Sequence, residues 1–338
     1  MGLNGILKIK IAILSIAVLF ASCSGEGEKE KNEKRENTVK KTPSLSRPDF
    51  NADSAYRYVE QQVAFGPRVP NTEAHRKAGN YLASKLKSFG FDITEQEAVL
   101  TAFNGEKLNS KNIIGEYKPE LNNRILLFAH WDSRPFADQA EENQNQAIDG
   151  ANDGASGVGV LLEIARQIQI KRPNIGVDIM FFDAEDYGQP NFDEGKRKPG
   201  SWCLGSQYFA KNPHRQNYRA NFGILLDMVG AKNAHFSKEA ISRYYAPQLL
   251  NRVWQNAALL GYSNYFINLE TQHVGDDDHV YINKILNIPS IDIIQYDHST
   301  QGFAPHWHTH DDSMEIIDKN TLRAVGETVL ATIFQEAT

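Results

Sequence analysis

Arg124-Ile-Leu-Leu-Phe-Ala-His130 is an almost unbroken apolar run, and Val177-Asp-Ile-Met-Phe-Phe182 and Phe222-Gly-Ile-Leu-Leu-Asp227 repeat its character further along the chain. Runs of this kind are typical of strands that are buried on both faces of a sheet. Helical patterns lie between and after them, at residues 157–169, 206–211, 246–260 and 320–334. This alternation predicts an α/β fold, namely a three-layer α/β/α sandwich around a mixed, mostly parallel central sheet.

Further elements lie on either side of these runs. Residues 93–99, 112–117 and 290–294 have strand character, and the first strands follow one another closely, so we expect part of the sheet to be antiparallel. Two amphipathic helices precede them, at residues 53–63 and 72–89. Asp53 is the expected capping carboxylate of the first helix, and Gly90 is expected to end the second.

The composition is that of an ordinary globular protein. Its 338 residues are 41% hydrophobic and 23% charged, enough for a large core. A net charge of -6 gives no electrostatic reason to expect nucleic-acid binding. The chain has two cysteines, Cys23 and Cys203, which stand in unrelated contexts, so a disulfide framework is not expected.

The N-terminus predicts export. Lys8 and Lys10 precede an apolar run at residues 11–21, which is too short to span a bilayer and suits the core of a signal peptide. Small residues directly before Cys23 resemble a bacterial lipoprotein cleavage site, so residues 1–22 are interpreted as a signal peptide of that type. A plain signal peptide, with Cys23 incidental, is the alternative.

The segment after the signal peptide predicts a tether. Residues 23–49 are charged and poor in apolar side chains, as expected of a disordered linker behind a lipidated cysteine. Residues 50–338 then form a single predicted catalytic domain. The expected location is the bacterial cell envelope, facing the periplasm or the cell surface, with the lipid anchor as the one contact with the membrane.

Residue types that bind metal ions recur at the ends of the predicted strands. In an open α/β sheet, ligands bind beyond the carboxyl ends of the strands. Asp153 instead precedes a helix, so helix capping is its simplest alternative explanation. The whole set indicates a metal-dependent active site, and its members are His130, Asp132, Asp153, Glu185, Asp186, Asp227 and His308.

A catalytic zinc commonly has three protein ligands and one open position. Asp153, one member of the Glu185-Asp186 pair, and His308 would supply such a set. The other member of the pair would remain free to move a proton. A surface turn is the alternative for the acidic pair, although Phe181-Phe182 directly before it favours a buried position.

The order of these motifs resembles the zinc aminopeptidase superfamily. Within it, Trp307-His308-Thr309 and Gly275-Asp-Asp-Asp-His279 resemble the animal-type glutaminyl-peptide cyclotransferases, or glutaminyl cyclases, and the resemblance covers most of residues 50–338. It implies one zinc held by Asp153, Asp186 and His308. It further implies that Glu185 is a proton shuttle, that Asp227 and Asp277 form an acidic hydrogen-bond network, and that Trp307 lines the substrate pocket.

The implied reaction converts the N-terminal glutamine of a peptide or protein to pyroglutamate, with release of ammonia. Asp186 departs from the family, in which glutamate is more usual, and Asp276 or Asp278 could take the place of Asp277. Residues 187–200 are interpreted as an insertion around the pocket mouth. Trp202 is the candidate for the tryptophan that the family carries on the pocket rim.

Two other functions compete with cyclisation. In a two-zinc aminopeptidase, His130 and Asp227 would hold a second zinc, Asp153 would bridge the two ions, and Glu185 would activate water. A non-catalytic lipoprotein that binds peptides or sugars is the third possibility, and it would predict a degraded metal site.

Overall fold

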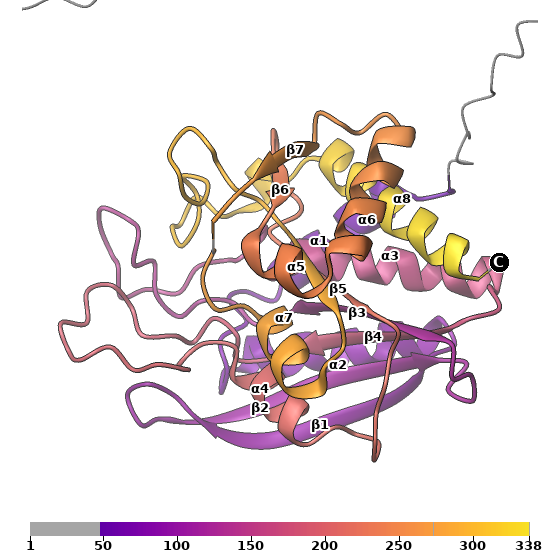
Figure 1. The fold of residues 1–338 in the computed structure, drawn as a ribbon. Coiled ribbons are helices and arrows are strands. Elements are labelled where there is room, and N and C mark those ends of the chain that lie inside the picture. The colour runs from indigo at the N-terminus through magenta and orange to yellow at the C-terminus, as the bar shows by residue number, and fades with distance from the viewer. Residues whose placement is uncertain (1–47, 273, 338) are drawn as a thin grey trace, which may run out of the picture. The chain divides into compact units, whose positions relative to one another are not determined.

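The computed structural model describes residues 48–272 and 274–337. The predicted signal peptide, Cys23 and nearly all of the tether lie outside these residues. The helices are α1 (Ala52–Val63), α2 (Glu73–Ser88), α3 (Ala155–Lys171), α4 (Leu204–Lys211), α5 (Ala240–Tyr245), α6 (Pro247–Leu259), α7 (Asp278–Tyr281), the π-helix η1 (Ile282–Leu286), the 3₁₀ helix η2 (Met314–Ile316) and α8 (Lys319–Glu336) (Figure 1). None of the described helices is both long enough and apolar enough to cross a bilayer.

A six-stranded sheet forms the centre of this region. Its strands are β1 (Asp92–Thr101), β2 (Lys107–Tyr117), β3 (Arg124–His130), β4 (Gly176–Phe182), β5 (Gly223–Asp227) and β8 (Ser290–Ile294), in the spatial order β1-β2-β4-β3-β5-β8. The four strands from β4 to β8 are mutually parallel, whereas β1 and β2 run antiparallel to their neighbours. The expected mixed, mostly parallel sheet is confirmed.

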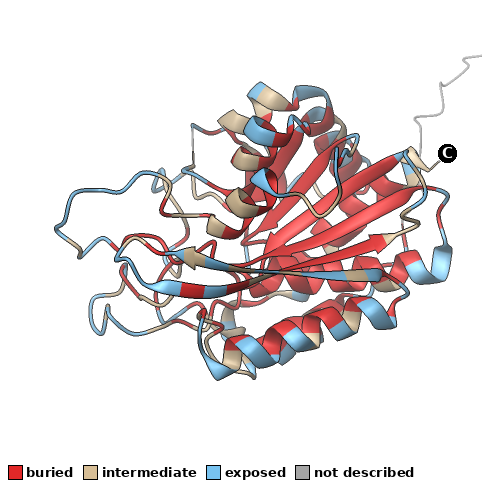
Figure 2. Cartoon of the chain, turned by 90° about the horizontal axis from the view of Figure 1, so that it is seen from below, coloured by how far each residue is buried: buried red, intermediate tan, exposed pale blue. Residues whose placement is uncertain are grey.

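Alternation along β3 divides the core into two layers. Ile125 and Leu127 face one layer, into which helices α1, α2, α3 and α8 pack, and Leu126 and Phe128 face another layer, which contains α4 and η1. Successive strand residues point to opposite faces, so an apolar run without alternation fills both layers. Figure 2 shows the resulting burial of the central strands.

One expectation about the N-terminal half is corrected, and another is confirmed. Asn51, rather than Asp53, caps α1, because the Asn51 side chain accepts the hydrogen bond from the backbone N–H of Ser54. The expected antiparallel part of the sheet is present, since β2 runs antiparallel to both β1 and β4, and β4 lies between β2 and β3. The structure also adds β6 (Phe236–Lys238) and β7 (Phe266–Glu270), a short parallel pair outside the main sheet that the sequence reading missed.

Candidate functional site

The carboxyl ends of the parallel strands bring the acidic and histidine residues to one edge of the sheet. β3 ends at His130, β5 ends at Asp227, and the acidic pair follows the end of β4. A cavity of about 210 Å³ opens at this edge. Its lining residues are Asp153, Glu185, Asp186, Trp202, Asp227, Met228, Val274, Gly275, Asp276, Asp277, Ile294, Phe303, Trp307 and His308.

Asp153, Asp186 and His308 meet at this cavity with one potential ligand atom each, all within 4.8 Å of one another. Nε2 of His308 lies 3.3 Å from Oδ1 of Asp186 and 3.6 Å from Oδ2 of Asp153. Burial raises the pKa of Asp186, and the neighbouring Asp153 carboxylate raises it further. The buried Oδ2 of Asp186 has no hydrogen-bond partner among the described residues. Two buried carboxylates and an imidazole in this arrangement fit a divalent cation.

Two further acids, Asp138 and Asp312, support this group. Oδ1 of Asp138 lies 3.2 Å from Nδ1 of His308, on the side of the ring away from the cavity group. The carboxylate of Asp312 accepts hydrogen bonds from the backbone N–H groups of Asn152 and Asp153. Asp138 lies in a loop without periodicity, and the sequence therefore gave no signal for it beyond its i, i+4 spacing from Arg134.

A second group shares Asp153. Nε2 of His130 lies 3.0 Å from Oδ1 of Asp153 and 3.2 Å from Oδ1 of Asp227. Burial by itself lowers the pKa of His130, but hydrogen bonds to Asp132, Asp153 and Asp227 outweigh it and raise the pKa well above its ordinary value. Two states are compatible with the short distances in this group: a protonated imidazole that bridges the two carboxylates, or a second bound cation.

Asp132 supports the acidic pair from behind. Its two carboxylate oxygens accept hydrogen bonds from the backbone N–H groups of Glu185 (3.1 Å) and Asp186 (3.2 Å). It is fully buried and does not line the cavity. This geometry places Asp132 behind the ligand group, where its Oδ1 also lies 3.5 Å from Nδ1 of His130.

Glu185 faces an acidic and thiol environment. Sγ of Cys203 donates a hydrogen bond of 3.1 Å to Oε1 of Glu185, and Asp277 completes a group whose polar atoms lie within 4.8 Å of one another. Burial raises the pKa of Glu185 well above its ordinary value, and the charges of Asp186 and Asp277 contribute further. A carboxyl group with a raised pKa in a cleft is suited to proton transfer.

The three consecutive aspartates occupy different places. Asp276 and Asp277 line the cavity, whereas Asp278 is fully buried and is not part of the lining. Asp277 also caps α7, because its Oδ1 accepts a hydrogen bond of 2.6 Å from the backbone N–H of Asp278. Of the three, Asp277 is therefore the one grouped with Glu185.

Aromatic rings form the wall of the cavity around His308. The Trp307 ring stacks on the imidazole at a centroid distance of 3.7 Å, and the Trp202 ring lies nearly parallel to it at 5.9 Å. None of residues 187–200 is among those that line the cavity, so an insertion around the pocket mouth stays a prediction. Tyr187 and Phe192 pack instead against Phe136, at 6.2 and 5.6 Å.

Backbone strain concentrates at the same edge. Four non-glycine residues beside the cavity adopt the left-handed region, which costs free energy for any side chain with a Cβ. Such a strained conformation persists where contacts with the surrounding residues hold the backbone in place. The four residues are Ala184 (φ 51°), Cys203 (φ 56°), Met228 (φ 49°) and His308 (φ 54°).

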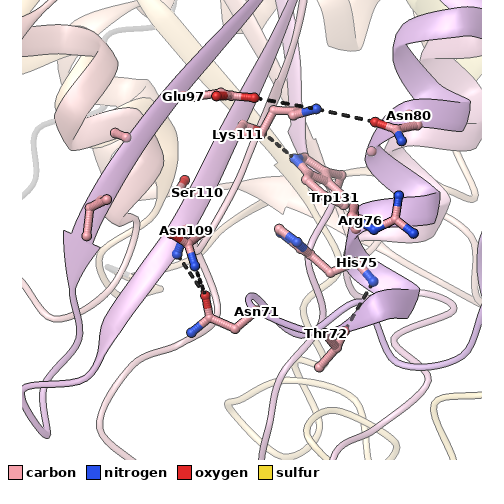
Figure 3. A pocket seen from close by; sticks show the side chains of 13 residues that line it. Asn71, Thr72, His75, Arg76, Asn80, Glu97, Asn109, Ser110, Lys111 and Trp131 are labelled. Carbon is pink, nitrogen blue, oxygen red and sulfur yellow. Dashed lines mark hydrogen bonds and ion pairs between the residues drawn. The ribbon is translucent and has the colours of Figure 1, made fainter.

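A larger hollow of about 680 Å³ lies elsewhere, between α2 and the β1–β2 hairpin (Figure 3). His75 and Trp131 are stacked there at 4.3 Å, and amide and hydroxyl side chains form much of the lining. Nε2 of His75 lies 2.9 Å from both carboxylate oxygens of Asp183, which precedes the acidic pair by two residues. This hollow contains none of the potential metal-binding groups, so we assign the chemistry to the smaller cavity.

Comparison with known protein families agrees with the fold described above. The sequence profile of peptidase family M28 matches residues 112–333, a range that contains every residue of the candidate site. The chain belongs to peptidase family M28. The expected resemblance to the zinc aminopeptidase superfamily is thereby confirmed.

Solved structures similar to this M28 protein carry two kinds of name. Tannerella forsythia glutaminyl cyclase is 59% identical, with a TM-score of 0.83, and the match covers 85% of this chain and 99% of that one. A Zn-dependent exopeptidase from Parabacteroides distasonis is 57% identical with the same TM-score, over 86% of this chain and 99% of the other. Aminopeptidase YwaD of Bacillus subtilis is 29% identical over 279 residues, or 80% of this chain, which spans about half (54%) of that protein's length.

Proposed function

We propose that this protein is a glutaminyl-peptide cyclotransferase. Its substrates are peptides or proteins with an N-terminal glutamine, and its products are the pyroglutamyl chain and ammonia. The observation that carries the proposal is the buried Glu185 carboxyl, which lies beside Asp277 and Cys203 at a cavity lined by two tryptophans. The similarity to Tannerella forsythia glutaminyl cyclase supports the same reaction.

The size of the cavity favours cyclisation over recognition of a longer peptide stretch. About 210 Å³ is less than the space of most small-molecule sites, which hold roughly 300–1,000 Å³. A single glutamine side chain, folded back toward its own α-amine, suits such a space. A pocket that enforces the folded conformer supplies much of the rate enhancement of an intramolecular reaction.

One zinc ion per chain, held by Asp153, Asp186 and His308, is part of the proposal. When bound, zinc supplies Lewis acidity toward the γ-carbonyl oxygen of the glutamine. Asp132 and Asp138 would hold the ligand residues in place through the contacts described above. Replacement of the family's usual glutamate by Asp186 shortens the side chain but preserves the carboxylate donor.

Glu185 moves the proton in the proposed reaction. The α-amine nitrogen forms a bond with the carbonyl carbon of the side-chain amide (Cδ), and the bond from that carbon to the amide nitrogen breaks. Glu185 accepts the proton that the amine loses and delivers it to the departing nitrogen, which leaves as ammonia. No water is consumed, and the carboxyl group returns to its starting state.

The test is Glu185→Gln, which keeps the shape of the side chain and removes its proton transfer. We expect zinc content equal to that of the unaltered protein and a kcat for a Gln-peptide lower by about 10²–10⁴-fold. Ammonia release and pyroglutamyl product are measured together. Retention of the full kcat would exclude Glu185 as the proton shuttle.

A two-zinc aminopeptidase is the second candidate, and the group of His130, Asp153 and Asp227 is the observation that favours it. Metal analysis of the purified protein distinguishes one zinc from two. A Gln-peptide and a leucine anilide then separate the reactions, because cyclisation releases ammonia without a free amino acid. Two zinc ions per chain with hydrolysis of the anilide would replace the cyclotransferase assignment.

We also propose that the mature chain is lipid-anchored through Cys23 in the bacterial cell envelope. The support is the sequence of residues 1–23. Metabolic labelling with a palmitate analogue tests this, with Cys23→Ser as the matched control. Label on the unaltered protein and none on the variant is the expected result, and an unlabelled protein in the soluble fraction would contradict it.

A further inference from the structure

Asp292 is a buried acid in the middle of an apolar strand. It lies in Ser290-Ile-Asp-Ile-Ile294, paired with Leu225 of β5, and has no exposed surface. Neither of its carboxyl oxygens has a conventional hydrogen-bond partner among the described residues. An ionised carboxylate in such a place is very costly unless a cation or several donors compensate it.

Acids and one histidine surround this side chain. Asp277, His279 and Asp292 each place one polar atom within 4.8 Å of the others. Nε2 of His279 also lies 3.4 Å from Oε1 of Glu239, which is itself fully buried. Burial acts to raise the pKa of Glu239, but its hydrogen bond to His279 outweighs this and lowers the pKa. The His279 side chain is therefore already paired with Glu239.

The surroundings favour the neutral form of Asp292. Burial raises its pKa well above the ordinary value, and the charges of Asp277, Asp227 and Glu239 raise it further. A neutral carboxyl group has one O–H to donate. Asp277 offers the acceptor, because its Oδ2 is buried without a partner among the described residues while its Oδ1 is held by the backbone N–H of Asp278.

We propose that Asp292 is a positioning residue for the cyclisation reaction: its neutral carboxyl donates a hydrogen bond to Oδ2 of Asp277 and so fixes that carboxylate beside Glu185. With both oxygens held, Asp277 has one orientation, in which it can share a hydrogen bond with the proton-carrying group. This inference rests on the proposed function. It places one further buried acid, on β8, behind those that line the cavity.

Two substitutions test the donated hydrogen bond. Asp292→Ala removes it, and we expect a kcat for a Gln-peptide lower by about tenfold or more, with KM within about twofold. Asp292→Asn restores an N–H donor in the same place, and we expect kcat to return to within about threefold of that of the unaltered enzyme. Zinc content is measured for each variant and should stay constant.

Asp178→Asn is the matched control. Asp178 is also a fully buried acid inside a strand, but it lies toward the start of β4, where it accepts hydrogen bonds from Arg124 and Tyr218. We expect this variant to melt at a lower temperature, with kcat per zinc-loaded molecule unchanged. It therefore separates loss of stability from loss of positioning.

Three results would overturn the proposal: full kcat in Asp292→Ala, Asp292→Asn as slow as Asp292→Ala, or the absence of the expected infrared signal. That signal is the band of a protonated carboxyl group, present in the unaltered protein and lost in Asp292→Asn, and it tests the neutral state even if the alanine variant does not fold. A zinc-loaded, unaltered protein that does not cyclise Gln-peptides would refute the proposed function, whereas the infrared result would still decide the state of Asp292.

Discussion

Nδ1 of His308 lies 3.2 Å from Oδ1 of Asp138, while Nε2 of the same ring faces Asp153 and Asp186. Arg134 donates hydrogen bonds to both oxygens of Asp138, at 2.7 and 2.9 Å, so the acid is itself held in place. The carboxylate thus fixes the orientation of the imidazole and the nitrogen that it presents to the cavity.

Asp138→Asn is therefore expected to weaken zinc binding. Loss of an outer carboxylate typically lowers metal affinity by about 10–100-fold. Competition with a chromophoric chelator measures the change. Glu142→Gln, which alters an exposed acid in the same loop, is the control and should bind zinc normally. Equal affinity in the two variants would show that Asp138 does not orient His308.

Cys203 is expected to contribute to catalysis through its hydrogen bond to Glu185. Cys203→Ser keeps a donor at the same place, so we expect its kcat to lie within about twofold of that of the unaltered enzyme. Cys203→Ala removes the donor and should lower kcat by about three- to tenfold. Steady-state kinetics with a Gln-peptide measures both. Equal kcat in the two variants would reduce the role of the thiol to filling space.

Trp307 is expected to bind the substrate. Its ring stacks on His308 and lines the cavity, so Trp307→Ala should raise KM for a Gln-peptide by about tenfold or more, while Trp307→Phe keeps part of the wall and has a smaller effect. Trp254→Phe, in the core on α6, is the control: it should lower the melting temperature and leave KM unchanged. An unchanged KM in Trp307→Ala would show that Trp307 does not contribute to substrate binding.

The strands of the site could be predicted from the sequence because a strand that is buried on both faces appears as a continuous apolar run. β3 and β8 have the predicted bounds, and His130 and Asp227 end their strands as expected. Parallel strands bring these ends to one edge, so the residues of the candidate site could be grouped from the sequence.

The supporting residues could not be found in this way. The contact of Asp138 with His308 joins loops that are 170 residues apart, and no local periodicity reports it. Asp292 appears in sequence only as an acid inside an apolar run. The position of β4 between β2 and β3 is likewise invisible, because spatial strand order does not follow from order along the chain.

Metal removal should make stability fall as the pH rises. Burial raises the pKa of Asp227 from 3.8 to about 7, and burial also raises that of Glu185. Between about pH 4 and pH 7 the folded, metal-free protein keeps protons that the unfolded chain has released, so this stabilisation is complete below about pH 4 and lost by about pH 7. Its size is on the order of a few kcal/mol.

The measurement is the melting temperature of chelator-treated protein at about pH 5 and about pH 7.5, with and without added zinc. We expect the metal-free protein to melt lower at the higher pH and zinc to raise the melting temperature more there, because metal binding requires ionised carboxylates. Asp227→Asn should flatten the dependence in the metal-free protein. A metal-free protein that is more stable at the higher pH would contradict the raised pKa values.

Gly157 ends the motif Asp153-Gly-Ala-Ser-Gly157 and lies in the first turn of α3, against the sheet. A Cβ at this position would lie 2.1 Å from the carbonyl oxygen of Leu226 and 3.0 Å from Cβ of Ala129. Both neighbours belong to buried strands that cannot move aside. Gly157→Ala must therefore push α3 away from the sheet, and Asp153, just before the helix, would move with it.

We expect Gly157→Ala to lower the free energy of unfolding by about 3 kcal/mol and to weaken zinc binding as well. Gly302→Ala is the control, because no atom lies within 4 Å of its Cβ position, and its effect should stay within about 0.5 kcal/mol. Chemical denaturation and zinc titration of both variants make the comparison. If Gly157→Ala unfolds at the same denaturant concentration as the unaltered protein, this glycine is not required for the close approach of α3 to β5. If it is less stable yet binds zinc normally, Asp153 is held by Asp312 and independently of the helix.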